Sequence, residues 1–368
     1  MKIGIVIRTC KTTGSSRYVV ETRKHIAENN ELHIFTNNWD PLDHRIIIHK
    51  IPTFTSNFYV WEAFFMTIST LVTKFYKFDV TLAQPTRYFS PDVAEMQFVY
   101  RNWNDYRDKN HIPVPNGDRF LPFIEKYNIK RAKQVIAISE SIKNEVLHYY
   151  HLPEERVNVI YNGVNTTDFT PENRSKYFNE IRDRHNISKE EIVLVFAGNP
   201  FVRKGLKYTI ESLPHLKTKN YKLLIIGGDD PNKQPYVEII HDLGLDDKVI
   251  WLGITPEIKK YFAASDIFVL PTRYEPFGIV IAEAMASGLP VVTSKLAGAA
   301  ELINDGNDGL HIIDPTDSVE IAEKLNYLIQ SDNVRKEMGR KARKKAENYS
   351  WENAAKQMLD VFEKAVRS

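Results

Sequence analysis

Short runs of apolar, mostly β-branched residues recur along the chain and alternate with longer amphipathic stretches. These runs predict strands over 2–7, 32–36, 45–51, 79–84, 95–99, 134–138 and 157–161. They predict a second set over 192–197, 221–227, 248–252, 266–270, 290–294 and 310–313. Several runs are continuously apolar, which is typical of strands buried on both faces of a parallel sheet. Helical patterns lie between most of them, so the sequence predicts an α/β fold with doubly wound sheets.

A polar segment divides the two sets of strands and indicates two domains. Residues 162–191 are rich in Asn, Asp, Glu and Arg and show no strand pattern, which is typical of a connection followed by a polar helix. The length of 368 residues also favours two domains. We expect two Rossmann-like halves, in which a ligand binds where the parallel strands end.

Charge and cysteine content narrow the function classes. Lys and Arg number 49 and Asp and Glu 47, a net charge of +2, which argues against a dedicated nucleic-acid binder. The single cysteine, Cys10, cannot form an intramolecular disulfide and favours a reducing cytoplasm. The apolar run within 1–8 is too short for a signal peptide. The charge-free stretch 63–73 is shorter than the ~18 apolar residues of a membrane span. We therefore expect a cytoplasmic protein without a transmembrane segment.

The segment 270–292 carries the most specific pattern. A strand ends near Leu270, a helix is predicted to begin at about 277–278, and Gly288 ends it. The helix start offers backbone N–H groups and a positive dipole end to a ligand. Glu275 precedes this helix and Glu283 lies inside it, so two carboxylates are available to the hydroxyls of one polyol ligand.

The segment 195–207 predicts an anion site. A strand ends, Gly198 opens a loop, and a helix is predicted to begin near Gly205, directly after Arg203 and Lys204. Two cations beside a helix start favour an anion such as a diphosphate. Neither a Walker sequence nor a Gly-x-Gly-x-x-Gly fingerprint occurs, which argues against a P-loop nucleotidase or a nicotinamide enzyme.

Together these two segments resemble the retaining GT-B glycosyltransferases of family 4, also called glycosyltransferase group 1. The resemblance covers most of the chain and is strongest over 192–309. It implies the GT-B fold, with an N-terminal acceptor-binding domain over 1–165 and a donor-binding domain over 166–350. The closing segment 351–368 resembles the family's helix that crosses back to the N-terminal domain.

The resemblance also implies roles for individual residues. Arg203 and Lys204 would bind the diphosphate of a nucleotide sugar and, with Glu275, make up the catalytic set. Glu275 would hold the hydroxyls of the donor sugar and Glu283 the ribose. The donor-binding set that the resemblance implies is Gly14, Ser15, Gly198, Arg203, Lys204, Glu275, Phe277, Gly278, Ile279 and Glu283.

Two departures from the family pattern concern the N-terminal half. The glycine-rich turn after the first strand is reduced to one glycine, in Thr12–Arg17, so Gly14 and Ser15 are its remaining candidates for close approach to a phosphate or acceptor. Many relatives carry a histidine on a strand of this domain. Here the comparable stretch, 95–103, contains no histidine. Gln97 most nearly takes its place as a candidate on the acceptor side.

These observations predict retaining transfer of a hexose from a nucleotide diphosphate sugar, with UDP-glucose as the model donor. The acceptor would be a hydroxyl of a glycan or lipid-linked molecule, as in the synthesis of a cell-envelope glycan. We expect neither metal nor cofactor, because there is no Asp-x-Asp pair to clamp a diphosphate through a cation. The alternatives left open are a nucleotide-sugar epimerase and a catalytically inactive binding partner.

Two further segments have alternative interpretations. The aromatic stretch 58–78 predicts a helix packed in the core, with contact to a membrane surface as the alternative. The basic run in 335–345 predicts a solvated helix face, with attraction to anionic lipid as the alternative. In the second interpretation the protein would sit peripherally at the inner face of the membrane.

Overall fold

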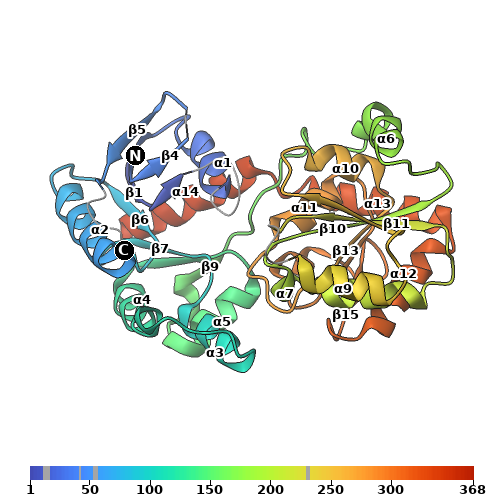
Figure 1. The fold of residues 1–368 in the computed structure, drawn as a ribbon. Coiled ribbons are helices and arrows are strands. Elements are labelled where there is room, and N and C mark those ends of the chain that lie inside the picture. Colours follow the sequence, from blue (N-terminus) through green and yellow to red (C-terminus); the bar gives the residue numbers. More distant parts are fainter. Residues whose placement is uncertain (11–16, 41–42, 53–56, 229–232) are drawn as a thin grey trace. The chain divides into compact units, whose positions relative to one another are not determined.

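The computed structural model describes residues 1–10, 17–40, 43–52, 57–228 and 233–368. The chain divides into two compact units (Figure 1). Unit 1 comprises Met1–Gly163 and Trp351–Ser368, and unit 2 comprises Val164–Ser350. The return of the last helix to unit 1 is the crossing that the family resemblance implies.

Unit 1 is built on a seven-stranded parallel sheet with the order β5-β3-β1-β6-β7-β8-β9. Its strands are β1 (Lys2–Val6), β3 (Glu31–Thr36), β5 (Ile46–Lys50), β6 (Val80–Ala83), β7 (Val93–Met96), β8 (Gln134–Ala137) and β9 (Val157–Val159). Two short strands, β2 (Thr9–Cys10) and β4 (Asn38–Trp39), form a separate parallel pair that the sequence pattern did not predict.

Helices cover this sheet. They are α1 (Arg17–Ile26), α2 (Phe58–Thr73), α3 (Tyr100–Lys109), α4 (Leu121–Arg131), α5 (Glu140–Tyr150) and α14 (Trp351–Arg367), with 3₁₀ turns at η2 (Asn116–Arg119) and η3 (Glu154–Arg156). α14 packs on α1 and against β6, β7 and β8 (Figure 1). α2 buries Trp61 and Phe65 against Val6, Phe35 and Ala83 of the sheet, as the core-packing interpretation predicts for one face of this stretch. Val60, Leu71 and Phe75 of the same stretch are exposed.

Unit 2 has a six-stranded parallel sheet with the order β12-β11-β10-β13-β14-β15. The strands are β10 (Ile192–Ala197), β11 (Tyr221–Ile226), β12 (Val249–Gly253), β13 (Ile267–Leu270), β14 (Val291–Ser294) and β15 (Leu310–Ile312). β13 and β14 are buried along their whole length, as the continuous apolar runs predict for strands covered on both faces. In both sheets the chain first adds strands from the centre toward one edge, then returns to the centre and adds strands toward the other edge. This is the Rossmann arrangement.

The helices of unit 2 lie between its strands and at the end of the unit. They are α6 (Asn173–Arg184), α7 (Phe201–Lys204), α8 (Leu206–Ser212), α9 (Gln234–Asp242), α10 (Ile258–Ala264), α11 (Ile279–Ala286), α12 (Ser318–Ile329) and α13 (Asp332–Ala346), with 3₁₀ turns at η4 (Leu213–His215) and η6 (Gly298–Leu302). α6 is the polar helix expected in the connecting segment.

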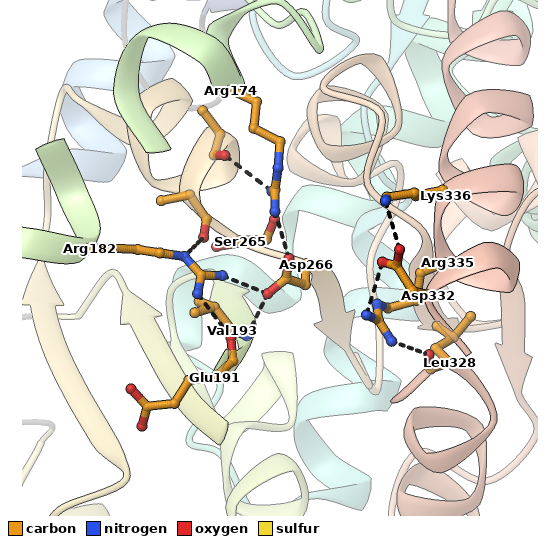
Figure 2. A network of polar contacts seen from close by, with 12 residues as sticks. Arg174, Arg182, Glu191, Val193, Ser265, Asp266, Leu328, Asp332, Arg335 and Lys336 are labelled. Atoms are coloured by element: carbon orange, nitrogen blue, oxygen red, sulfur yellow. Dashed lines mark hydrogen bonds and ion pairs between the residues drawn. The ribbon is translucent and has the colours of Figure 1, made fainter. Parts of the chain in front are cut away.

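An ion-pair network anchors α6 to the start of the sheet of unit 2 (Figure 2). Arg182 is 2% exposed and donates to Asp266 Oδ2 at 2.7 Å and to the carbonyl of Ala264 at 3.1 Å. Arg174 donates to the other Asp266 oxygen at 2.9 Å, and the amide of Val193 donates to Oδ2 at 2.9 Å. Because the buried guanidinium is neutralised and hydrogen-bonded, α6 is tied to the strands that carry the candidate site.

The structure confirms the α/β class and the two parallel-sheet domains predicted from the sequence. One predicted strand is displaced: 95–99 is observed as β7, Val93–Met96, because Val93 pairs with Leu82 directly after Asp92, whose carboxylate accepts from the amide of Thr81. The unit boundary at 163/164 lies two residues before the expected 165/166. Within the described ranges, none of the helices has the length and apolar character required to span a bilayer.

Candidate functional site

The two segments singled out in the sequence meet at one point of unit 2. β10 and β13 are neighbours at the centre of the sheet, and the chain continues from them toward opposite edges. The segment after β10 carries Arg203 and Lys204, and the loop after β13 carries Glu275. Ligands of doubly wound sheets bind at such a switch point, beyond the carboxyl ends of the strands.

Arg203, Lys204 and Glu275 form one ion-pair cluster. Arg203 Nη1 donates to Glu275 Oε2 at 2.9 Å and to the carbonyl of Tyr274 at 2.7 Å. Lys204 Nζ donates to the same Oε2 atom. The cluster therefore holds two cations and one carboxylate, and its net charge of one positive unit favours an anionic ligand.

The cluster is largely removed from solvent. The side chains of Arg203, Lys204 and Glu275 are 16%, 7% and 11% exposed. Burial lowers the pKa of Lys204 below its ordinary value and Arg203 adds to this, while the attraction of Glu275 opposes it. Burial would raise the pKa of Glu275, but the attraction of Lys204 and Arg203 outweighs it, so this pKa lies below its ordinary value. The carboxylate is held in its charged form by the two cations.

Close backbone packing places the two cations. Arg203 and Lys204 belong to α7, a single turn that the sequence pattern did not predict, and α8 begins after Gly205. Gly205 has φ +78°, and a Cβ there would lie 2.0 Å from the carbonyl oxygen of Pro271. A Cβ at Gly198 would lie 2.8 Å from Lys204 Cγ. Larger residues at these two glycines would displace the cations from Glu275.

The loop that carries Glu275 is fixed by backbone hydrogen bonds to the segment after β14. The amide of Glu275 donates to the carbonyl of Leu296 at 3.2 Å, and the carbonyl of Glu275 accepts from the amide of Gly298 at 2.9 Å. The carbonyl of Phe277 accepts from the amide of Ala299 at 2.7 Å. Glu275 thus approaches the cations from a backbone held on both sides.

Helix α11 begins directly beside this loop. Gly278 is its N-cap, with φ +95°, and Ile279 is its first residue. A Cβ at Gly278 would lie 3.0 Å from Glu275 Cγ, so glycine gives the tight turn and leaves the carboxylate its place. Glu283 lies inside α11 and is 6% exposed. A glutamate is seldom this buried unless its carboxylate has a partner, so Glu283 has a ligand-binding or structural role rather than that of a surface residue.

The structure brings together Gly198, Arg203, Lys204, Glu275, Phe277, Gly278 and Ile279 at the switch point of unit 2, with Glu283 on the same helix α11. Gln97 belongs to unit 1, where it follows β7. Within the described part of unit 1, the buried Gln97 Nε2 atom has no hydrogen-bond partner. Gly14 and Ser15 lie outside the described residues.

The direct pairing of Glu275 with both cations was not predicted from the sequence. The sequence does contain a signal for this pairing. Opposite charges follow two predicted strands, and in the strand order of a Rossmann sheet those two strands are neighbours at the centre. The backbone carbonyl of Tyr274, which also binds Arg203, leaves no side-chain signal.

The basic run on α13 is largely ion-paired. Lys336 and Arg335 pair with Asp332, at 2.6 and 3.2 Å, and Arg340 pairs with Glu337 at 2.8 Å (Figure 2 shows the first two pairs). Arg343 donates from Nη1 to the carbonyls of Thr166, Phe169 and Ala286. These contacts favour a packed and solvated helix face over a lipid-binding one.

The known proteins that this chain resembles include glycosyltransferases. The family model described as Glycosyl transferases group 1 matches residues 178–345, and the Glycosyltransferase Family 4 model matches residues 12–168. An uncharacterized glycosyltransferase of Methanocaldococcus jannaschii is 32% identical over 236 residues, covering 63% of this chain and 60% of that protein. The chain thus spans about three fifths of the length of the curated relatives it matches.

Solved structures match nearly the whole chain. WaaG, a glycosyltransferase involved in lipopolysaccharide biosynthesis, has a TM-score of 0.80 at 19% identity, covering 98% of this chain and 99% of its own. Anabaena HepE in complex with UDP and glucose has a TM-score of 0.75 at 20% identity, covering 98% of both chains. At these identities the likeness establishes the fold, which is that of these glycosyltransferases.

Proposed function

Because this chain belongs to the glycosyltransferase group 1 family and has its GT-B fold, we propose that it transfers a hexose from a nucleotide diphosphate sugar to a hydroxyl of a glycan or lipid-linked acceptor. The observation that carries the proposal is the cluster of Arg203, Lys204 and Glu275 at the switch point of unit 2. UDP-glucose is the preferred donor candidate, since the structurally similar HepE was solved with UDP and glucose.

In this proposal, Arg203 and Lys204 bind the diphosphate of the donor. Negative charge on the leaving diphosphate grows as the bond between sugar and phosphate breaks. Two cations in a largely buried site stabilise that charge more strongly than they would in water. Because they are fixed by Glu275 and by the close packing at Gly198 and Gly205, little reorganisation is needed at the moment of reaction.

The carboxylates and the start of α11 bind the rest of the donor. Glu275 accepts from hydroxyls of the sugar, and Glu283 accepts from the ribose. The backbone over 277–279 approaches the sugar and phosphate, which the absence of a side chain at Gly278 permits. Such contacts orient the donor, and correct orientation lowers the entropic part of the barrier.

Retention of configuration and independence from metal belong to the same proposal. The carboxylate nearest the cations, Glu275, is already engaged by both of them, which disfavours its use as a covalent nucleophile. Attack by the acceptor on the face of the departing phosphate then gives retention. The anomeric configuration of the product, read from its ¹H NMR coupling constants, tests this, and an inverted product would refute it.

A donor panel tests the overall proposal. The protein is incubated with UDP, GDP and ADP sugars, and release of nucleoside diphosphate is measured with candidate hydroxyl acceptors. We expect acceptor-dependent release from one nucleotide class, with a UDP-hexose as the best donor. Interconversion of the donor sugar without transfer would indicate an epimerase, and donor binding without turnover would indicate a binding protein. Either result would overturn the proposal.

We also propose a cytoplasmic protein in peripheral contact with the inner face of a membrane, and helix α4 supports this better than α13 does. Phe120, the N-cap of α4, and Phe123 in its first turn are 67% and 70% exposed, and Tyr127 one turn later is 49% exposed. Lys126 and Lys130 are exposed on the same helix. Exposed aromatics beside cations fit the interface of an anionic bilayer.

Co-sedimentation with phosphatidylglycerol vesicles tests the membrane contact. Phe123→Ser should reduce the bound fraction severalfold, while Val319→Ser, an exposed apolar residue of unit 2, should not change it. Equal binding of both variants and the unaltered protein would refute the role of α4.

A further inference from the structure

The sheet of unit 1 has its own switch point, and a second charged cluster lies there. β1 and β6 are neighbours at the centre of the sheet, and the chain proceeds from them toward opposite edges. Arg8 follows β1 by two residues, and Arg87 follows β6 by four. Both arginines therefore lie at the carboxyl ends of the central strands, where doubly wound sheets bind their ligands.

Both arginines bind one buried carboxylate from helix α2. Glu62 is 5% exposed; its Oε1 accepts from Arg8 Nη1 at 3.3 Å, and its Oε2 accepts from Arg87 Nη1. The cluster carries two cations and one anion, as the cluster of Arg203, Lys204 and Glu275 does in unit 2. The remaining positive charge favours an anionic ligand.

Arg8 is placed to meet a ligand. Its side chain is 41% exposed, whereas those of Arg87 and Glu62 are 10% and 6% exposed. Its guanidinium lies over the rings of Phe58 and Trp61, with centroid distances of 4.9 and 4.8 Å. Contact with two rings and with Glu62 restricts the guanidinium, and the planar group can bind carboxylate or phosphate through two parallel hydrogen bonds.

The cluster also contains donors that lack an acceptor. Within the described residues, Arg87 Nε and Trp61 Nε1 are buried without a hydrogen-bond partner. Arg87 and Trp61 are both buried. Both atoms are N–H donors, and an unsatisfied buried donor is costly. Both belong to residues of the cluster, since Arg87 binds Glu62 and the Trp61 ring lies under the half-exposed Arg8.

We propose that Arg8, supported by Arg87, Glu62 and the rings of Phe58 and Trp61, forms a subsite for an oxyanion of the acceptor substrate. The group bound is a phosphate or a carboxylate, and Arg8 contacts it directly. Assigning the oxyanion to the acceptor rests on the proposed function, because unit 2 already supplies the cations for the donor diphosphate. Glu62 is a positioning residue that keeps both guanidinium groups at the strand ends.

Titration of the full chain with inorganic phosphate and with acetate tests the subsite. The protein is first titrated with UDP by calorimetry, so that the cations of unit 2 are occupied before the second anion is added. If UDP does not bind, the proposed donor site has failed, and the phosphate titration is made in a Lys204→Ala background instead. The two proposals therefore fail separately.

Arg8→Gln is the test variant and Arg45→Gln its matched control. Arg45 also belongs to unit 1, is 38% exposed and pairs with a carboxylate, that of Asp43. We expect phosphate or acetate to bind in the millimolar range, and Arg8→Gln to weaken that binding at least tenfold. Arg45→Gln should change it less than twofold, and UDP affinity should stay the same in both variants.

Arg8→Lys separates charge from geometry and protects the test against a folding defect. It should bind the anion with intermediate affinity, because a point charge replaces the planar fork. Tighter binding of phosphate than of acetate would assign a phosphate-bearing acceptor, and the reverse a carboxylate-bearing one. No anion binding beyond UDP, or equal losses in Arg8→Gln and Arg45→Gln, would overturn the subsite.

Discussion

Replacing Lys204 by alanine removes one of the two cations at the switch point of unit 2. The ammonium group is 7% exposed and shares one oxygen of Glu275 with Arg203. After the change, Arg203 still neutralises Glu275, so the local fold keeps its ion pair. The cluster then has no net positive charge with which to stabilise the departing diphosphate.

The size of the effect follows from this geometry. A single preorganised electrostatic group in a site shielded from water contributes roughly 10²–10³ to kcat, or about 2.7–4 kcal/mol. Lys204 meets both conditions, so kcat should fall ~100-fold or more. Charge on the diphosphate is greatest when the bond is breaking, so the donor KM should rise much less than kcat falls.

Steady-state kinetics with the preferred donor, at saturating acceptor, measures both parameters. Lys204→Arg should restore only part of the rate, because a planar fork replaces the compact point charge of the ammonium group. Lys341→Ala is the control, since Lys341 is 38% exposed and pairs with Glu337 on α13. Its kcat and KM should match those of the unaltered protein.

A change confined to KM would refute the reasoning for Lys204. It would mean that the cation binds the donor equally well in the ground state and in the transition state. A thermal melt of Lys204→Ala accompanies the kinetics, because a large fall in Tm would attribute the lost rate to unfolding.

Four further outcomes are expected. Glu283→Ala should weaken UDP binding by about 1–3 kcal/mol in calorimetry, through lost charge-assisted hydrogen bonds, and unchanged affinity would remove Glu283 from the site. Activity should survive EDTA; a chelator-sensitive rate restored by Mg²⁺ or Mn²⁺ would contradict the metal-free proposal. Arg182→Met should cost about 1–3 kcal/mol of unfolding free energy in urea, because buried acceptors lose their donor while Arg174 still pairs with Asp266, whereas Arg184→Met at the surface should cost less than about 1 kcal/mol. Burial raises the pKa of Cys10 to about 11, so at pH 8 the native thiol should stay protonated and react with a thiol reagent only after unfolding.

The architecture was predictable because parallel strands buried on both faces leave a strong signal. Runs such as the one that becomes β10 admit few polar residues, and the helices between them fix the parallel order. Two features fell outside this signal. β2 and β4 are two residues long, too short for any periodicity, and α7 is a single turn placed by tertiary contacts around Gly205.

The candidate site was predictable in its members but not in its pairings. Arg203, Lys204 and Glu275 were visible as charged residues directly after predicted strands. That they converge on one carboxylate oxygen depends on β10 and β13 being neighbours, although 69 residues separate β10 from the start of β13. The backbone contacts that hold the Glu275 loop to 296–299 involve amides and carbonyls, which every residue carries and no sequence pattern reveals.

The cluster of unit 1 shows why sequence reasoning found one charged cluster and not the other. In unit 2 all three charged groups follow strands, so a scan of strand ends finds them. In unit 1 the carboxylate comes from α2, 54 residues after Arg8, and lies among apolar neighbours in a stretch whose pattern predicts only core packing. The two clusters nevertheless occupy the same topological position, at the central strands of their sheets. In a Rossmann sheet this position is where ligands bind. Cations that are partly buried there need an opposite charge, and a buried glutamate supplies it in both units. Glu62→Gln should therefore release Arg8 and weaken phosphate binding less than Arg8→Gln does, because the positioning group is lost while the contacting group remains.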